Sequence, residues 1–191
     1  AAFIAVFPYV WVVLSSLKPD RVMMVIPPSI TFNPQLRNYR LIMADGFMSC
    51  LWDSVKVAIG SSLLAVSCST MAAYGLTRFR YRGREALAYM TFSMRFIPFI
   101  TLLIPLYTIV GSLGLLGSTV GLVIAYQLMH IPWMTWLIRS FFLEIPMSYE
   151  EAAMVDGLTK WGTFFRIGLP MVAPAVGAAT LLGIIFSWNQ Y

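Results

Sequence analysis

Apolar residues dominate the chain in five long runs, which shorter polar segments separate. A membrane-spanning helix needs about 20 mainly apolar residues. The pattern therefore predicts an all-α polytopic membrane protein with spans near residues 1–17, 54–77, 86–110, 119–143 and 168–191. The first and last runs reach the chain ends without a polar exit. We therefore expect one transmembrane domain over 1–191, truncated at both ends.

Small residues mark one face of the second predicted span. Ser61, Ala65, Ser69 and Ala73 recur at every fourth position, so a helix places them on the same side. Small side chains let neighbouring helix backbones approach closely in lipid. The pattern favours helix packing, and contact with a transported substrate is the alternative.

The third predicted span carries residues that a simple anchor lacks, namely Arg95, Pro98 and Pro105. A charge at the membrane centre costs at least about 2.5 to 3.5 kcal/mol on insertion scales. Carbonyl groups freed by proline are tolerated only against protein or water. Arg95 is thus a candidate for a translocation pathway, and an internal ion pair or a bond to backbone carbonyls is the alternative.

Polar side chains also lie within the last two predicted spans: Tyr126, Gln127 and His130 in one, and Asn189 in the other. Polar groups inside a membrane need partners and often mark a functional path. We therefore take these four residues as further pathway candidates. The alternatives are a satisfied structural role for His130 and a bond across helices for Asn189. The Gly117-x-x-x-Gly121 spacing is a weaker indication of helix packing.

Composition agrees with a membrane protein, because 59% of residues are hydrophobic and only 11% are charged, against about 25% charged in soluble domains. The net charge of +5 is less informative about orientation in the membrane than the positions of the charged residues. The short segment 78–85 contains four arginines, so the positive-inside rule places it in the cytoplasm. Alternation then puts 18–53 and 111–118 outside and 139–166 inside. A nucleic-acid-binding role for the arginines is disfavoured.

The segment 148–174 is the one long polar insertion between the later spans. Ser148 and Glu151 have the spacing of a capping box, which predicts a helix start, and Gly157 predicts its end. Helical spacing places Tyr149, Ala152, Ala153 and Asp156 on one face, which is small at its centre. A second short helix is expected over 159–167, with Pro170 as its end.

This insertion resembles the EAA signature of permease subunits of bacterial ABC (ATP-binding cassette) importers. Both the residues and their spacing match, and the matching positions are Glu151, Ala152, Ala153, Gly157, Ile167, Leu169 and Pro170. The resemblance implies that 148–170 is a cytoplasmic coupling segment that sits in a cleft of an ATPase subunit. Glu150, Glu151 and Asp156 would meet basic residues there. Solvated helix charge is the alternative for Glu150 and Asp156, and a plain surface hairpin is the alternative for the segment.

Shorter motifs narrow the resemblance to the carbohydrate-importing permeases of the maltose-transporter type. They follow the family's order along the chain and include Ala72-Ala73-Tyr74-Gly75, Ile104-Pro105-Leu106-Tyr107 and Trp188-Asn189. That family has a further span after the last motif, so it implies six spans in the intact protein. It also implies uptake of a sugar or related polyol. The alternative is an importer permease for an amino acid, a peptide or an ion.

The resemblance also implies an inner-membrane location and a set of partners. These are a second permease of different sequence, two ATPase subunits that hold ATP and Mg²⁺, and an external solute-binding protein. No cofactor is expected on this chain. An intramembrane enzyme is disfavoured, because the sequence has one histidine and neither a His-Glu-x-x-His nor a Gly-x-Ser-x-Gly motif. A non-transporting membrane anchor is the remaining alternative class.

Overall fold

The structure is a computed structural model that describes residues 2–190, apart from the side chains of Ala2, Phe3 and Phe99. All regular elements within the described residues are helical. The chain divides into two compact units, Ala1–Trp52 and Asp53–Tyr191. The expected all-α class is confirmed, whereas the single permease domain over the whole chain stays a prediction.

The first unit contains α1 (Ala2–Ser16), α2 (Asp20–Met23) and α3 (Arg37–Ala44). Lys18, two residues after the end of α1, is buried, and its ammonium group lies 4.4 Å from the centroid of the Trp11 ring. The Asn38 side chain donates hydrogen bonds to the carbonyl oxygens of Ser16 and Lys18. These contacts hold part of the polar segment against the end of the first apolar run.

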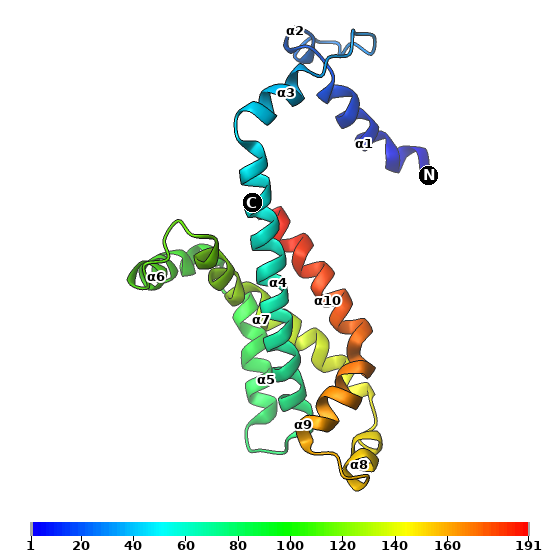
Figure 1. The fold of residues 1–191 in the computed structure, drawn as a ribbon, viewed down its shortest axis with the longest axis vertical. Coiled ribbons are helices and arrows are strands. Elements are labelled where there is room, and N and C mark those ends of the chain that lie inside the picture. The colour runs from blue at the N-terminus through cyan, green and yellow to red at the C-terminus, as the bar shows by residue number, and fades with distance from the viewer. Residues whose placement is uncertain (1, 191) are drawn as a thin grey trace. The chain divides into compact units, whose positions relative to one another are not determined.

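The second unit is built on three long helices: α4 (Phe47–Arg78), of which it contains the part from Asp53 onward, α7 (Thr119–Glu144) and α10 (Leu169–Asn189). These helices pack together (Figure 1), and the fully buried residues of the core include Ala65, Ala73, Met134, Ile138, Phe142 and Ala179. By length and composition, three helical stretches can cross a membrane: Phe47–Arg78, Thr119–Glu144 and Lys160–Asn189. A bent helix pair raises the number to four, so the predicted five spans are not confirmed among the described residues.

The face of small residues on α4 packs as predicted. Ser61, Ala65, Ser69 and Ala73 are all 0% exposed. The hydroxyl groups of Ser61 and Ser187 lie 3.0 Å apart, which joins α4 to α10. The Ser69 hydroxyl donates to the backbone of α7 at 3.3 Å. The interpretation as helix packing is confirmed.

The third predicted span is not one straight helix. It consists of α5 (Arg84–Ser93), a 3₁₀ turn η1 (Met94–Phe96) and α6 (Phe99–Ser112), and the two helical parts meet at 101°. Pro98 precedes α6, and Ile97 is extended at φ −71°, ψ 122°, as a residue before proline prefers. Pro98 therefore breaks the helix, whereas Pro105 is accommodated within α6.

The two glycines of the Gly117-x-x-x-Gly121 spacing have different roles. Gly117 has a φ of +73° and lies in the turn before α7. Gly121 lies against the backbone carbonyl of Leu115, where a Cβ atom would not fit. The expected helix packing is thus corrected only for Gly117, which shapes the α6–α7 turn. Gly121 allows α7 to approach α6 closely, because a Cβ atom there would lie 3.1 Å from the Val110 side chain.

The polar insertion forms α8 (Ser148–Val155), α9 (Lys160–Thr163) and a π-helical turn η2 (Phe164–Gly168) that leads into α10. The predicted capping box is wrong. Met147 occupies the N-cap position without a side-chain cap, and its carbonyl accepts the backbone N–H groups of Glu150 and Glu151. Ser148 is thus already the first helical residue.

Gly157 ends α8 as predicted, at a φ of +94°. The Gly157 and Leu158 N–H groups bond to the carbonyl oxygens of Met154 and Ala153, which is a Schellman ending. The predicted helix end at Pro170 is wrong, because a helical stretch runs from Lys160 to Asn189. Proline is tolerated near the start of α10 because the π-helical turn η2 comes directly before it.

Candidate functional site

A buried ion pair joins the end of α4 to the first turn of α8. The Arg78 Nε atom lies 2.6 Å from a Glu150 carboxylate oxygen, and the two side chains are 7% and 4% exposed. The Tyr74 hydroxyl donates to the other carboxylate oxygen at 2.9 Å. Arg78 also donates to the Ile145 carbonyl at 3.2 Å and lies over the ring of Phe142. Both charges are therefore hydrogen-bonded, as buried charges must be.

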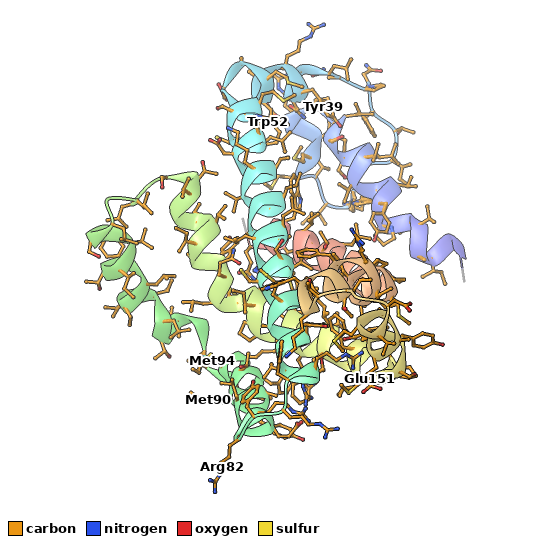
Figure 2. The ribbon with its side chains drawn as sticks, turned by 60° about the horizontal axis from the view of Figure 1, so that its bottom comes forward. Tyr39, Trp52, Arg82, Met90, Met94 and Glu151 are labelled. Atoms are coloured by element: carbon orange, nitrogen blue, oxygen red, sulfur yellow. The ribbon has the colours of Figure 1, made fainter. Side chains whose placement is uncertain are left out.

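A second ion pair holds the other end of the arginine-rich loop. Arg139 of α7 donates to the Glu85 carboxylate at 2.7 Å, and Arg84 contacts the same carboxylate at 3.1 Å. The Glu85 side chain is 52% exposed, so this pair contributes less to stability than the buried one. Between these anchors Arg80 and Arg82 stay exposed, and Arg82 extends away from the helices (Figure 2). The loop is therefore held at the same end of the second unit as α8 (Figure 1).

Three of the four residues predicted to share one face of α8 are exposed, and the fourth is not. Tyr149, Ala152 and Asp156 are exposed as expected, and Glu151 is exposed beside them. Ala153, however, is only 8% exposed and turns toward the chain. Glu150 is 3% exposed, so its alternative as a solvated helix charge is wrong.

The remaining signature residues lie around the π-helical turn. Ile167 and Leu169 are half-buried and Pro170 is exposed. Gly168, between them, is buried, and a Cβ atom there would lie 3.3 Å from the Tyr74 ring. Sequence reasoning missed the roles of Gly168, Tyr74 and Arg78, although the arginine at the end of an apolar run and the nearby acidic helix were visible signals.

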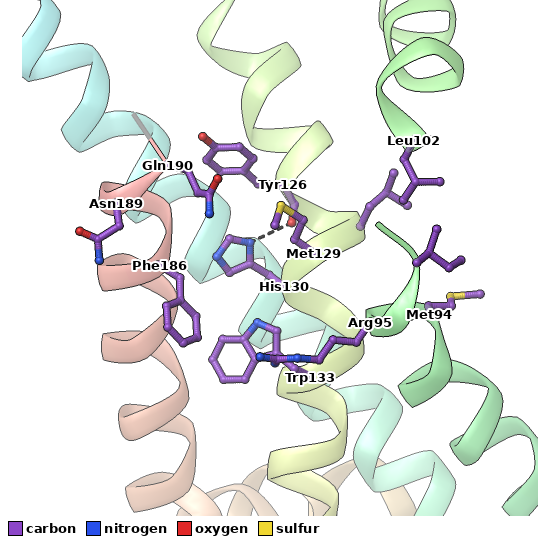
Figure 3. Close-up of a pocket in the computed structure, with 12 residues that line it drawn as sticks. Met94, Arg95, Leu102, Tyr126, Met129, His130, Trp133, Phe186, Asn189 and Gln190 are labelled. Atoms are coloured by element: carbon purple, nitrogen blue, oxygen red, sulfur yellow. Dashed lines mark hydrogen bonds between the residues drawn. The ribbon is translucent and has the colours of Figure 1, made fainter. Parts of the chain in front are cut away.

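A hollow of about 350 Å³ opens between η1, α6, α7 and α10 (Figure 3). It brings together four of the five pathway candidates, Arg95, Tyr126, His130 and Asn189. Its other walls come largely from apolar or aromatic side chains that sequence reasoning did not single out, among them Met94, Trp133 and Phe186. The rings of Trp133 and Phe186 meet edge to face at 5.4 Å.

His130 and Gln127 form hydrogen bonds with other residues of the helix bundle. The His130 Nδ1 atom lies 2.8 Å from the Tyr126 carbonyl oxygen, and Nε2 lies 3.1 Å from the Ser187 hydroxyl. His130 is 3% exposed, which favours the satisfied structural role. Gln127 is absent from the hollow's walls and donates to the carbonyl oxygens of Ser61 and Val123. Gln127 thus joins α7 to α4.

Comparison with known proteins decides the family. A profile of the family described as "Binding-protein-dependent transport system inner membrane component" matches residues 65–191. The chain belongs to this family. The expected permease subunit of a binding-protein-dependent importer is therefore confirmed, together with its inner-membrane location. The family consists of membrane transport components, which agrees with the expectation that the chain is not an enzyme.

Individual relatives support the narrower resemblance. The chain is 33% identical to the sulfoquinovosyl glycerol transport system permease protein SmoH of Agrobacterium fabrum, over 97% of this chain and 66% of the relative. It is 32% identical to the trehalose transport system permease protein SugB of Mycobacterium tuberculosis, over 97% and 68%. The chain thus spans about two thirds of the length of these curated relatives.

A solved structure shares the fold. The crystal structure of a bacterial ABC transporter involved in the import of the acidic polysaccharide alginate matches with a TM-score of 0.76 and 26% identity. The match covers 100% of this chain and 67% of that chain. The similarity to the carbohydrate-uptake group of permeases is confirmed by these relatives.

Proposed function

We propose that the intact protein forms part of the membrane pathway of an ATP-driven importer for a sugar or related polyol. It would act with a second permease, two ATPase subunits that bind ATP and Mg²⁺, and an external solute-binding protein. Relatives whose names specify trehalose, lactose and diacetylchitobiose transport support a carbohydrate substrate. We also propose six spans in the intact protein and a cytoplasmic position for 148–170.

The observation that carries this proposal is the two-sided character of α8. Its inner side is fixed by Glu150 and Ala153, while Glu151, Ala152 and Asp156 are exposed at the same end as the arginine-rich loop. An exposed face on a firmly held helix is suited to receive a partner's motion. Since Arg78 ends α4, a displacement of α8 would pass directly to a long membrane helix.

Alternating access requires two states that differ in their contacts with each ligand. We propose that ATP-driven closure of the ATPase subunits moves α8 through its exposed face, with Ile167, Leu169 and Pro170 carrying that movement into α10. The hollow beside Arg95, Tyr126, His130 and Asn189 would be one wall of the pathway. The permease itself performs no covalent chemistry in this mechanism.

Reconstitution of the intact transporter in proteoliposomes tests the function. Labelled trehalose, maltose, the acidic disaccharide cellobiouronic acid and glycine are offered outside with the purified binding protein, and ATP or a non-hydrolysable analogue is supplied on the ATPase side. The proposal predicts uptake of at least one sugar only with ATP and binding protein. Uptake of glycine alone, or equal uptake with the analogue, would contradict it.

A further inference from the structure

Arg95 carries the one positive charge among the residues that line the hollow, and none of those lining residues is acidic. Its side chain comes from the break between α5 and α6 and reaches toward the space between α7 and α10 (Figure 3). Among the described residues none forms an ion pair with it, although Arg37, Arg78, Arg84 and Arg139 each contact a carboxylate.

Arg95 lies at the break of a bent helix pair that can count as one membrane span, and its side chain is exposed in this chain. A charge inside a membrane requires a compensating partner, because an isolated charge is costly there. The planar guanidinium group binds carboxylate or sulfonate oxygens through two parallel hydrogen bonds. Two sources can supply such an anion, which are a carboxylate of the second permease or the transported ligand. The hollow's volume of about 350 Å³ lies at the lower end of the range of small-molecule sites.

The other walls of the hollow favour a ligand over a partner side chain. Trp133 and Phe186 supply flat apolar surfaces, and the amides of Asn189 and Gln190 supply donors and acceptors. Sites that bind small polar molecules commonly combine aromatic walls with a few polar groups. A single partner carboxylate would use the guanidinium group and leave the amides without a role.

We propose that the hollow binds the anionic group of an acidic sugar, with Arg95 pairing with a carboxylate or sulfonate and Trp133 and Phe186 contacting the ring. This inference rests on the proposed function, since it specifies the substrate class of the same pathway. The carboxylate would replace the water that otherwise hydrates Arg95, whereas a neutral sugar offers no such charge.

The test compares two disaccharides that differ in one group, cellobiouronic acid and cellobiose. Each is titrated by calorimetry into the purified nucleotide-free transporter without its binding protein, so that only the membrane pathway is probed. A charge-assisted bidentate contact predicts that the acid binds about tenfold more tightly or better. In Arg95→Gln the preference for the acid is expected to disappear.

Control variants make the test specific. Arg82→Gln removes an exposed arginine outside the hollow and should keep the preference for the acid. Arg95→Lys keeps the charge but loses the planar guanidinium group, so it should weaken binding of the acid several-fold. This variant replaces Arg95→Gln in the test if the Arg95→Gln transporter does not assemble. Equal binding of both sugars by the wild type, or an unchanged preference in Arg95→Gln or Arg95→Lys, would overturn the inference.

The two proposals fail in different ways. If the transporter takes up sugar with ATP but shows no preference for the acid, the acidic substrate class is wrong and the proposed function stands. An Arg95-dependent acid preference in a transporter that takes up no sugar would contradict the function. If Arg95 instead pairs with the second permease, Arg95→Gln will lower the melting temperature of the complex and leave the sugar affinities unchanged, which also overturns the inference.

Discussion

The Nε atom of Arg78 lies 2.6 Å from the carboxylate of Glu150, and this contact joins the last residue of α4 to the first turn of α8. Tyr74, one helical turn before Arg78, donates to the same carboxylate. The helix that carries the family signature is therefore tied to a membrane helix through two side chains. This connection is central to the proposed transmission of movement.

Replacing Glu150 by Gln tests how much the buried pair contributes. The substitution keeps the shape but leaves Arg78 as an uncompensated buried charge, and breaking such a pair costs about 3 to 5 kcal/mol. We expect a clear fall in the thermal unfolding midpoint of the purified transporter. Glu151→Gln is the matched control, because an exposed substitution is expected to change stability by no more than about 0.5 kcal/mol.

The double variant Arg78→Met/Glu150→Leu sharpens this prediction. Replacing both members by apolar residues removes the unpaired charge, so much of the lost stability should return. The same melting measurement decides the outcome. If Glu150→Gln melts like the wild type, the pair does not hold α8 in place.

Gly157 tests the geometry of the coupling segment. Its φ of +94° is strained for a β-branched residue, so Gly157→Val should disturb the end of α8 and uncouple ATP hydrolysis from transport. Gly157→Asn is the control, because asparagine accepts left-handed backbone more readily. ATPase activity is measured with and without loaded binding protein. Wild-type stimulation in Gly157→Val would refute the prediction.

Gly183 tests the close approach of α10 to its neighbours. A Cβ atom there would overlap the Met134 methyl group and lie 3.0 Å from the Ser62 hydroxyl oxygen. Gly183→Val should therefore lower stability by about 1 to 3 kcal/mol through overpacking. Gly177→Val is matched, since no atom lies within 4 Å of a Cβ at that position. Equal melting of the two variants would be inconsistent with this packing.

Several features followed from the sequence because they depend on local chemistry. The small residues of α4 at fourfold spacing had to share a face, and burial at 0% confirms the packing. Gly157 had the backbone freedom that a helix end needs. The long apolar runs around 54–77, 119–143 and 168–191 identified the three helices that can cross a membrane.

Other features depend on tertiary contacts that no local pattern encodes. The bend at Pro98 was expected only as a disturbance, because proline removes a hydrogen bond without fixing the direction of the next helix. The burial of Glu150 depends on Arg78, which lies 72 residues earlier. In a helix as short as α8, docking decides which side faces inward. The hollow likewise joins segments from four elements, η1, α6, α7 and α10.

The central claim is that the exposed face of α8 transmits ATP-driven movement, and charge reversal at Glu151 tests it most directly. The intact transporter is reconstituted, and ATP hydrolysis is measured with and without sugar-loaded binding protein for the wild type, Glu151→Lys and the exposed control Glu144→Lys. The account predicts stimulation in the wild type and in the control, and its loss in a folded Glu151→Lys complex. Full stimulation in Glu151→Lys would contradict the account.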